Sequence, residues 1–484
     1  MSSLDLARWQ FGITTVYHFL FVPLTIGLAP MVAIMQTVWH RTGNPVWLRL
    51  TRFFGKLLLI NFALGVVTGI VQEFQFGMNW SSYSRFVGDV FGAPLAMEGL
   101  AAFFLESTFL GLWIFGWDRL PKRIHLATIW LLAIGVNLSA YFILAANSFM
   151  QHPVGVRFNP ESGRAELNSI WTMLGNVTAL ATFPHVIAGA WLVAGGFVLA
   201  VSAWHLARRA DKPDTVATFR PAFRFALGSV LVAGLAVVVS GHWQGQIMVE
   251  QQPMKMAAAE ALCNTEDGAG LSLFAVGSIN ASCDEVKSVT IPGLLSFMSY
   301  NDPDATVQGV NDIQAAMVER YGDGDYVPNL PVTYWSFRLM IGLGLLTVGL
   351  ALVGLWLTRR GRVPGKGWYA KLAVLLVVAP FAANSFGWIF TEMGRQPWVV
   401  VPDPDGPDAV RMLTASGVSP SVGATSVAIS LMTFTLVYAA LAAVEFTLLI
   451  RYAKAGPPPD QPDVAGDDTG GTDSTDERPM AFAY

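Results

Sequence analysis

Six residues that can bind a metal or carry a proton lie inside, or at the end of, stretches that are otherwise apolar. Ionisable side chains are costly in a membrane interior and usually serve a function there. Imidazole, thioether and carboxylate groups are all possible axial ligands of haem iron, and carboxyl groups also transfer protons. The residues are His18, Glu98, Glu106, His185, Met340 and Glu392.

Two arginines accompany these groups. Arg395 follows Glu392 by three residues in the segment SFGWIFTEMGRQPW, and its charge offsets a carboxylate that would cost several kcal/mol in apolar surroundings. Arg338 precedes Met340 by two residues, and its guanidinium can pair with a haem propionate. From residue types alone, packing or a polar network is the favoured interpretation of His185, and ordinary core packing that of Met340, so haem ligation is the alternative at this point.

Glu98 and Glu106 are predicted to carry protons. They are eight residues apart, about 12 Å along an ideal helix, with side chains about 80° apart around it. Ser139, in the next apolar stretch, is a candidate relay between them. The alternative is a pair of neutral, hydrogen-bonded structural carboxyl groups.

The composition of the chain indicates one polytopic helical membrane protein. Its 484 residues are 53% hydrophobic and only 13% charged, whereas soluble domains carry about 25% charged residues. A membrane-spanning helix needs about 20 apolar residues. We therefore predict an all-α bundle of nine spans at 13–39, 54–74, 93–116, 124–149, 176–205, 222–242, 333–357, 371–391 and 424–450.

Lys and Arg in the connections give the orientation. Twenty of the 30 lie in 40–57, 117–123, 206–224, 358–371 and after 450, while nine lie in the loops of the other side. Positive charge favours the cytoplasmic side, which predicts an outer N-terminus and a cytoplasmic C-terminus. No signal peptide, internal repeat or nucleotide-binding motif is found, and no nucleic-acid partner is expected.

Two segments are predicted to lie outside the membrane. A loop of about 90 residues at 243–332 is long enough to suggest a function, and 455–484 is rich in Pro, Gly and Asp, as in disordered tails. Cys263 and Cys283 both fall in the loop. In an oxidising compartment a disulfide between them would contribute about 3 kcal/mol; two free thiols are the alternative. The predicted parts are 1–242, 243–332, 333–454 and 455–484.

Several motifs together resemble subunit I of the cytochrome bd quinol oxidases, and the resemblance runs through all nine spans. Six motifs occur in the same order, each around a residue named above or at the end of a span. They are QFGITTVYHFLFVPLTIGL, PLAMEGLAAFFLEST, ANSFMQHPVG, FPHVIAG, YWSFRLMIG and GWxxxExGRQPW.

The resemblance implies three haems in one subunit. His185 and Met340 resemble the ligands of the low-spin haem b558, with Arg338 as its electrostatic partner. His18 and Glu392 resemble the ligands of the high-spin pair, and we expect haem d on the histidine and haem b595 on the glutamate. Glu98 is then expected close to that pair. Arg395 is expected to hold Glu392 or a propionate, and Trp388 to pack against a macrocycle.

The loop resembles the quinol-oxidising Q-loop of that family, in a compact form that carries the cysteine pair. Lys255 and Glu260, in VEQQPMKMAAAEAL, match the residues implicated in binding and deprotonating quinol; surface charges on an exposed helix are the alternative. The implied reaction oxidises menaquinol or ubiquinol at the outer face and passes electrons through haem b558 to the b595/d pair. Oxygen is reduced to water there with cytoplasmic protons that pass Glu106 and Glu98, which generates membrane potential without a pump.

The resemblance also implies a second large subunit, subunit II, possible small single-span accessory subunits, and a place in the bacterial plasma membrane. Two other functions are weighed against the oxidase. One is a proton-coupled transporter without haem, whose purified form is colourless. The other is a haem-bearing quinol dehydrogenase or reductase module, which does not consume oxygen with quinol as its only donor.

Overall fold

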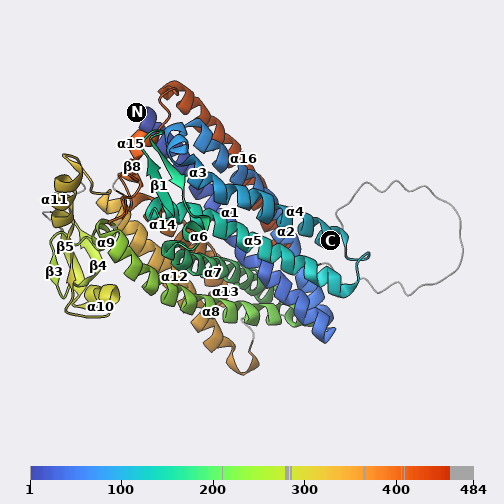
Figure 1. The fold of residues 1–484 in the computed structure, drawn as a ribbon. Helices are drawn as coiled ribbons and strands as arrows, with labels where there is room; N and C mark the ends of the chain where they lie inside the picture. The colour runs from blue at the N-terminus through green and yellow to red at the C-terminus, as the bar shows by residue number, and fades with distance from the viewer. Residues whose placement is uncertain are drawn as a thin grey trace, which may run out of the picture.

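The computed structural model describes residues 2–209, 211–277, 283, 286–362, 367–404, 406–407 and 409–457. The predicted tail at 455–484 lies outside these residues from 458 onward. Within them, nine helices are long and apolar enough to cross a membrane, which confirms the predicted number. The nine run side by side as one bundle (Figure 1).

The helices are longer than the predicted spans. The first six spans are α1 (Ser3–Thr42), α2 (Pro45–Met78), α3 with α4 (Ser81–Met97, Phe103–Phe115), α5 (Lys122–Gln151), α7 (Val177–Arg208) and α8 (Pro213–Gln251). The last three are α12 (Leu330–Thr358), α13 with α14 (Trp368–Leu375, Val378–Met393) and α16 (Ala424–Ala455). Because α8 continues to Gln251, the loop before α12 starts nine residues later than the sequence indicated.

Local sequence signals fix the ends of α1 and the start of α2. The Ser2 hydroxyl accepts from the Asp5 amide while the Asp5 carboxylate accepts from the Ser2 amide, a capping box that satisfies two free donors. Gly43 ends the helix at a φ of 66°, a conformation that glycine adopts without strain. Asn44 then caps α2, with Pro45 in its first turn.

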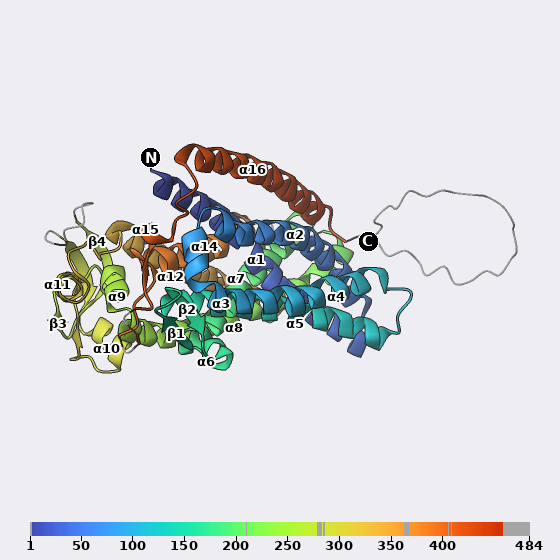
Figure 2. The ribbon, with the colours of Figure 1, turned by 45° about the horizontal axis from the view of Figure 1, so that its top comes forward.

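The centre of the bundle is formed by α1 and α7. In each of these helices 72% of the residues in an 18-residue apolar stretch are buried, compared with 11% in α16. A Cβ on Gly27 would lie 2.2 Å from the Ala190 carbonyl oxygen, so only glycine allows α1 to approach α7 this closely. Figure 2 shows α16 at the edge of the bundle, alongside α1 and α2. His18 and His185 therefore belong to the two innermost helices.

Two predicted spans are not regular α-helices. In the third, Glu98–Ala102 forms a π-helical turn, η1, between α3 and α4. In the eighth, the helix breaks between Leu375 and Val378. Pro380 explains this break, because its ring excludes the carbonyl four residues earlier and it has no amide to donate.

The segment between α8 and α12 lies beyond one end of the bundle, the end at which α1 begins, and α16 ends at the opposite one (Figure 1). It contains α9 (Pro253–Glu260), α10 (Leu294–Tyr300) and α11 (Val310–Tyr321). The described strands pair two by two and antiparallel. They are β1 (Val156–Asn159) with β2 (Arg164–Leu167), β3 (Glu266–Asp267) with β6 (Thr306–Val307), β4 (Leu271–Val276) with β5 (Lys287–Ile291), and β7 (Trp398–Val400) with β8 (Met412–Leu413).

Candidate functional site

The two central histidines have the same hydrogen-bonding arrangement. Nδ1 of His18 lies 2.8 Å from the Thr68 hydroxyl, which itself donates to backbone carbonyls of α2 at 3.0 Å. Nδ1 of His185 lies 3.1 Å from the Ser240 hydroxyl, which donates to the Ala236 carbonyl at 2.6 Å. Since each hydroxyl hydrogen is already used, each hydroxyl accepts from the histidine. Nδ1 then carries the proton and Nε2 keeps a free lone pair.

A bare Nε2 whose ring is oriented through Nδ1–H is the form of histidine that ligates metals. A glycine follows each supporting hydroxyl and leaves room beside the ring. A Cβ on Gly69 would lie 3.2 Å from Cε1 of His18, and a Cβ on Gly241 would lie 3.2 Å from Cε1 of His185. No hydrogen bond to either Nε2 is found among the described residues. Both donors therefore fit haem iron.

Met340 lies on α12 and faces α14. A Cβ on Gly387 would approach its sulfur to 2.9 Å, so α14 supplies the space for the thioether. His185, by contrast, is held by Ser240 and Gly241 of α8. The two proposed ligands of one haem are thus supported by different helices, which the sequence did not indicate.

Glu392, at the end of α14, is held on both carboxylate oxygens. Asn147 of α5 donates to Oε1 at 2.8 Å, and Arg395 donates to Oε2. Arg395 also donates to the carbonyls of Trp398 and Val399 at 2.9 and 2.8 Å. The expectation that Arg395 holds Glu392 therefore agrees with these contacts.

A cleft of about 1090 Å³ opens beside this carboxylate, between the first half of α1 and the end of α14. Trp388 lines it and stacks on Phe19, with ring centroids 5.0 Å apart. The Nε1 atom of Trp388 and the Nε atom of Arg395 are buried donors that no described protein group satisfies. Apolar walls with unpaired donors and a carboxylate fit a macrocycle that carries propionates.

Both carboxyl groups of the predicted proton route face α5. Ser139 donates to Glu98 at 2.7 Å and lies close to Glu106. A Cβ on Gly135, one turn before Ser139, would lie 3.1 Å from Cγ of Glu106. The 80° separation expected from an ideal helix is wrong, because the π turn accommodates one extra residue. One step of about 100° is thereby removed, which brings the second side chain to about 20° on the other side of the first.

Lys255 and Glu260, both on α9, face different partners. Lys255 is buried and donates to Gln151 Oε1 at 3.1 Å and to the Thr391 carbonyl at 3.2 Å. Burial lowers the pKa of Lys255 to about 7, although the nearby Glu392 opposes this shift. The lysine amine is therefore poised between its two protonation states near neutral pH.

Glu260 binds Arg338. The guanidinium donates to Glu260 Oε2 at 2.5 Å, and the Ser272 amide donates to the same carboxylate at 2.9 Å. Burial raises the pKa of Glu260, and Arg338 opposes that rise. Arg338 was expected to serve a haem propionate. Its Nη2 is instead committed to Glu260, while its Nε remains an unpaired buried donor.

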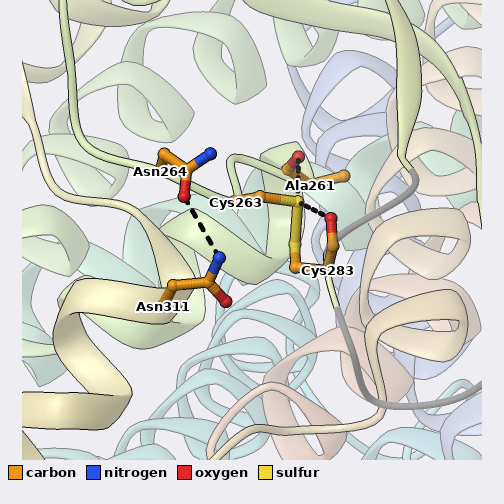
Figure 3. Close-up of a disulfide and its surroundings, with 5 residues drawn as sticks. All are labelled: Ala261, Cys263, Asn264, Cys283 and Asn311. Carbon is orange, nitrogen blue, oxygen red and sulfur yellow. Dashed lines mark hydrogen bonds between the residues drawn. A yellow bond between two sulfur atoms is a disulfide. The ribbon is translucent and has the colours of Figure 1, made fainter.

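The loop is tied together near α9. Cys263 and Cys283 form a disulfide, and Figure 3 shows Asn311, at the start of α11, donating to Asn264 beside it at 3.1 Å. The backbone amide of Asn311 donates to the Cys263 carbonyl at 2.9 Å. These contacts fix the chain that follows Glu260.

Sequence reasoning missed several supporting residues. Thr68 and Ser240 share a detectable signal, a hydroxyl residue followed by glycine within a span. Asn147 and Gln151 lie in the ANSFMQHPVG motif, but no role was assigned to them. His125 and His205 lie near the ends of two predicted spans, where the sequence by itself predicts solvated side chains. Instead both are buried, and they bond to Gln36 and to the Ala453 carbonyl, respectively.

These features define a polytopic helical membrane protein whose interior holds side chains able to ligate haem iron. The chain matches the family described as cytochrome bd terminal oxidase subunit I over residues 6–457. It is 48% identical over 459 residues to the cytochrome bd ubiquinol oxidase subunit 1 of Bacillus subtilis (strain 168), which covers 94% of each chain.

A second relative, the cytochrome bd-II ubiquinol oxidase subunit 1 of Escherichia coli (strain K12), is 35% identical over 512 residues, with 94% of this chain and 97% of that one covered. Among solved structures, the bd oxidase from Geobacillus thermodenitrificans superposes with a TM-score of 0.82 at 29% identity, covering 94% of this chain and 99% of that chain. The chain therefore belongs to the cytochrome bd terminal oxidase subunit I family, and it is an oxidoreductase of the membrane.

Proposed function

We propose that this chain is the haem-bearing subunit of a quinol oxidase that reduces oxygen to water. The observation that carries the proposal is the pair of bare Nε2 atoms on His18 and His185, each fixed by a hydroxyl that accepts from Nδ1. Bound haem supplies electron transfer and oxygen reduction. His185 with Met340 would hold haem b558, His18 haem d, and Glu392 haem b595.

The chain's own residues would orient these groups and exclude water from them. Arg395 compensates the Glu392 carboxylate, and Trp388 packs along the cleft beside it. The unpaired N–H groups of Trp388, Arg395 and Arg338 would donate to propionate oxygens. Their burial favours this role, because an unsatisfied buried donor costs about 1–3 kcal/mol.

Quinol would be oxidised at the loop, at the face proposed to be outside. Lys255, with a pKa of about 7, can be protonated or neutral near neutral pH, and Glu260 is a buried carboxylate. One can hold a proton and the other can accept one from a quinol hydroxyl. The two lie five residues apart on α9 and face different helices, α14 and α12. Menaquinol and ubiquinol are both compatible with this chemistry.

Protons for oxygen reduction would enter from the cytoplasmic side through Glu106, Ser139 and Glu98. The contact of Ser139 with Glu98 supports this order. Because quinol releases protons on one side and oxygen reduction takes them from the other, the reaction would generate membrane potential without pumping. The charge asymmetry of the loops supports an outer N-terminus and a cytoplasmic C-terminus. The bacterial relatives support placement in the bacterial plasma membrane.

Subunit II and small single-span subunits are the proposed protein partners. Apolar side chains exposed on α8, α12 and α16 are suited to lipid or to such helices.

A reduced-minus-oxidised visible spectrum of the purified protein, with quinol-driven oxygen uptake on the same sample, tests the proposal. We expect b-type and d-type bands together with oxygen uptake. A colourless protein from haem-supplied cells would instead support the proton-coupled transporter. Haem bands without oxygen uptake would support the dehydrogenase or reductase module.

A further inference from the structure

Glu445 on α16 is a buried carboxyl group to which the reaction described above assigns no role. It is 0% exposed although α16 lies at the edge of the bundle. Neither of its oxygens has a hydrogen-bond partner among the described residues. An ionised carboxylate in such a place would need a cation or several donors, so this carboxyl rests in its protonated form.

Glu445 belongs to a polar stripe on α16. Tyr438, Glu445 and Tyr452 are spaced by seven residues, which places them on one face of a helix in steps of about 10 Å. This face packs on α1 and α2. Tyr438 is 2% exposed, and its hydroxyl donates to the Thr68 carbonyl at 3.4 Å. The hydroxyl of Thr68 is the one that accepts from His18.

Two other buried oxygens that lack a hydrogen-bond partner among the described residues belong to α1 and α2, the helices on which this face of α16 packs. The Tyr17 hydroxyl of α1 has no hydrogen-bond partner in the described part of the chain, and its ring centroid lies 4.6 Å from that of Tyr438. Asn61 of α2 donates to the Phe21 carbonyl while its Oδ1 atom is unpaired, and Phe21 packs on Phe446, the neighbour of Glu445. Polar groups from three helices therefore occur where α16 packs on α1 and α2, and each polar atom left unsatisfied there needs an explanation.

The opposite end of the stripe reaches basic residues. Lys56 of α2 lies 4.1 Å from the ring centroid of Tyr452, and His205 of α7 lies within 2.8 Å of the Ala453 carbonyl. With Tyr17, these are the titratable groups that face the stripe from α1, α2 and α7. The stripe thus runs from the end proposed to be cytoplasmic to the residue that orients His18.

We propose that Glu445 is a proton-holding residue of the oxidase reaction, on a second route that is separate from Glu98 and Glu106. This inference rests on the proposed function. Reduction of oxygen to water takes one proton for each electron, so Glu445 would release its proton toward the Thr68 end. The carboxylate would then be reprotonated from the Tyr452 end. Tyr438 and Tyr17 supply hydroxyl groups along the way.

Redox-difference infrared spectroscopy of the purified oxidase, in water and in heavy water, tests the inference. We expect a carboxylic carbonyl band that shifts in heavy water, is lost in Glu445→Gln and moves in Glu445→Asp. Oxygen uptake should fall at least tenfold in Glu445→Gln with the visible haem bands intact, and severalfold in Tyr438→Phe. Thr433→Val, which removes an exposed hydroxyl of the same helix, should match the unmodified protein.

An infrared spectrum and an oxygen-uptake rate that are unchanged in Glu445→Gln would make this residue a static neutral carboxyl and overturn the inference. If Glu445→Gln loses its haems, the Glu445→Asp spectrum decides the matter, since a carbonyl band that does not move also overturns it. Absence of haem bands in the unmodified protein would instead refute the proposed function itself.

Discussion

Arg338 of α12 and Glu260 of α9 form a buried ion pair, with 2.5 Å between the guanidinium nitrogen and the carboxylate oxygen. Lys255, five residues earlier on the same short helix, faces Gln151 and Thr391 instead. The two residues that the sequence suggested as a quinol-handling pair therefore lie in separate environments, and the proposed role of each can be tested separately.

Arg338→Gln should move the acidic limb of the pH–activity profile to higher pH. Burial already raises the pKa of Glu260, and the guanidinium opposes that rise. Without the cation the pKa rises further, so Glu260 loses its ability to accept a proton at a higher pH. Breaking a buried pair also costs about 3–5 kcal/mol. The measurement is kcat/KM for a soluble quinol analogue against pH. Lys287→Gln, an exposed loop change, is the control, and an unmoved limb in Arg338→Gln would contradict the prediction.

Lys255 should make the loop more stable as pH increases from about 7 to about 10.5. Its folded pKa of about 7 lies below the ordinary 10.5, so the unfolded loop binds the extra proton between these values. The dependence amounts to a few kcal/mol. Limited proteolysis in denaturant, at neutral and alkaline pH, measures it. Lys255→Met should flatten the dependence, whereas Lys287→Met should keep it. An equally steep dependence in both variants would rule the idea out.

Thr68→Val should weaken haem retention at His18 about 10- to 100-fold, the usual effect of losing a residue that orients a ligand. Without the hydroxyl oxygen, nothing fixes the proton on Nδ1. Thr347→Val is the matched control, because Thr347 is also buried and, among the described residues, its hydroxyl bonds only to the Leu343 carbonyl. Haem content per protein after washing in detergent is the readout, and equal loss in both variants would argue against an orienting role.

Met340→Leu should abolish the low-spin haem spectrum while leaving the haem d signals. Leucine fills the space beside Gly387 but offers no sulfur to iron. The reduced-minus-oxidised spectrum of the purified variant measures this. A normal low-spin spectrum would show that Met340 is an ordinary packing residue.

Reduction of the Cys263–Cys283 disulfide should destabilise the loop by about 3 kcal/mol, the chain-entropy value for a closure of 20 residues. Intact-mass analysis with and without reduction and alkylation tests whether the bond is present. Proteolytic sensitivity of the double Cys263→Ser, Cys283→Ser variant then measures its effect. Free thiols in the native protein would refute the bond.

The spans were predictable because a run of 20 apolar residues has few alternatives to crossing a membrane. The π turn at Glu98 was not, since no residue in PLAMEGLAAFF marks an inserted position. Ligand candidates could be found by residue type, but the partners of Arg338 and Lys255 depend on how α9 docks. Glu445 was overlooked because it stands alone in its apolar run. Its seven-residue spacing from Tyr438 and Tyr452 is the signal that could have revealed it.

The eight residues of α9 are clamped at both ends, by Lys255 against α14 and by Glu260 against α12, and every residue from Met254 to Glu260 is buried. The helix α9 is therefore held in place from two sides and is not free to swing as a lid would. Because so short a helix bends little, we expect a displacement at Lys255 to move α9 as a whole and to reach, through the Glu260–Arg338 pair, the stretch of α12 that bears Met340. The two ends of α9 would then differ in their partners and still move together.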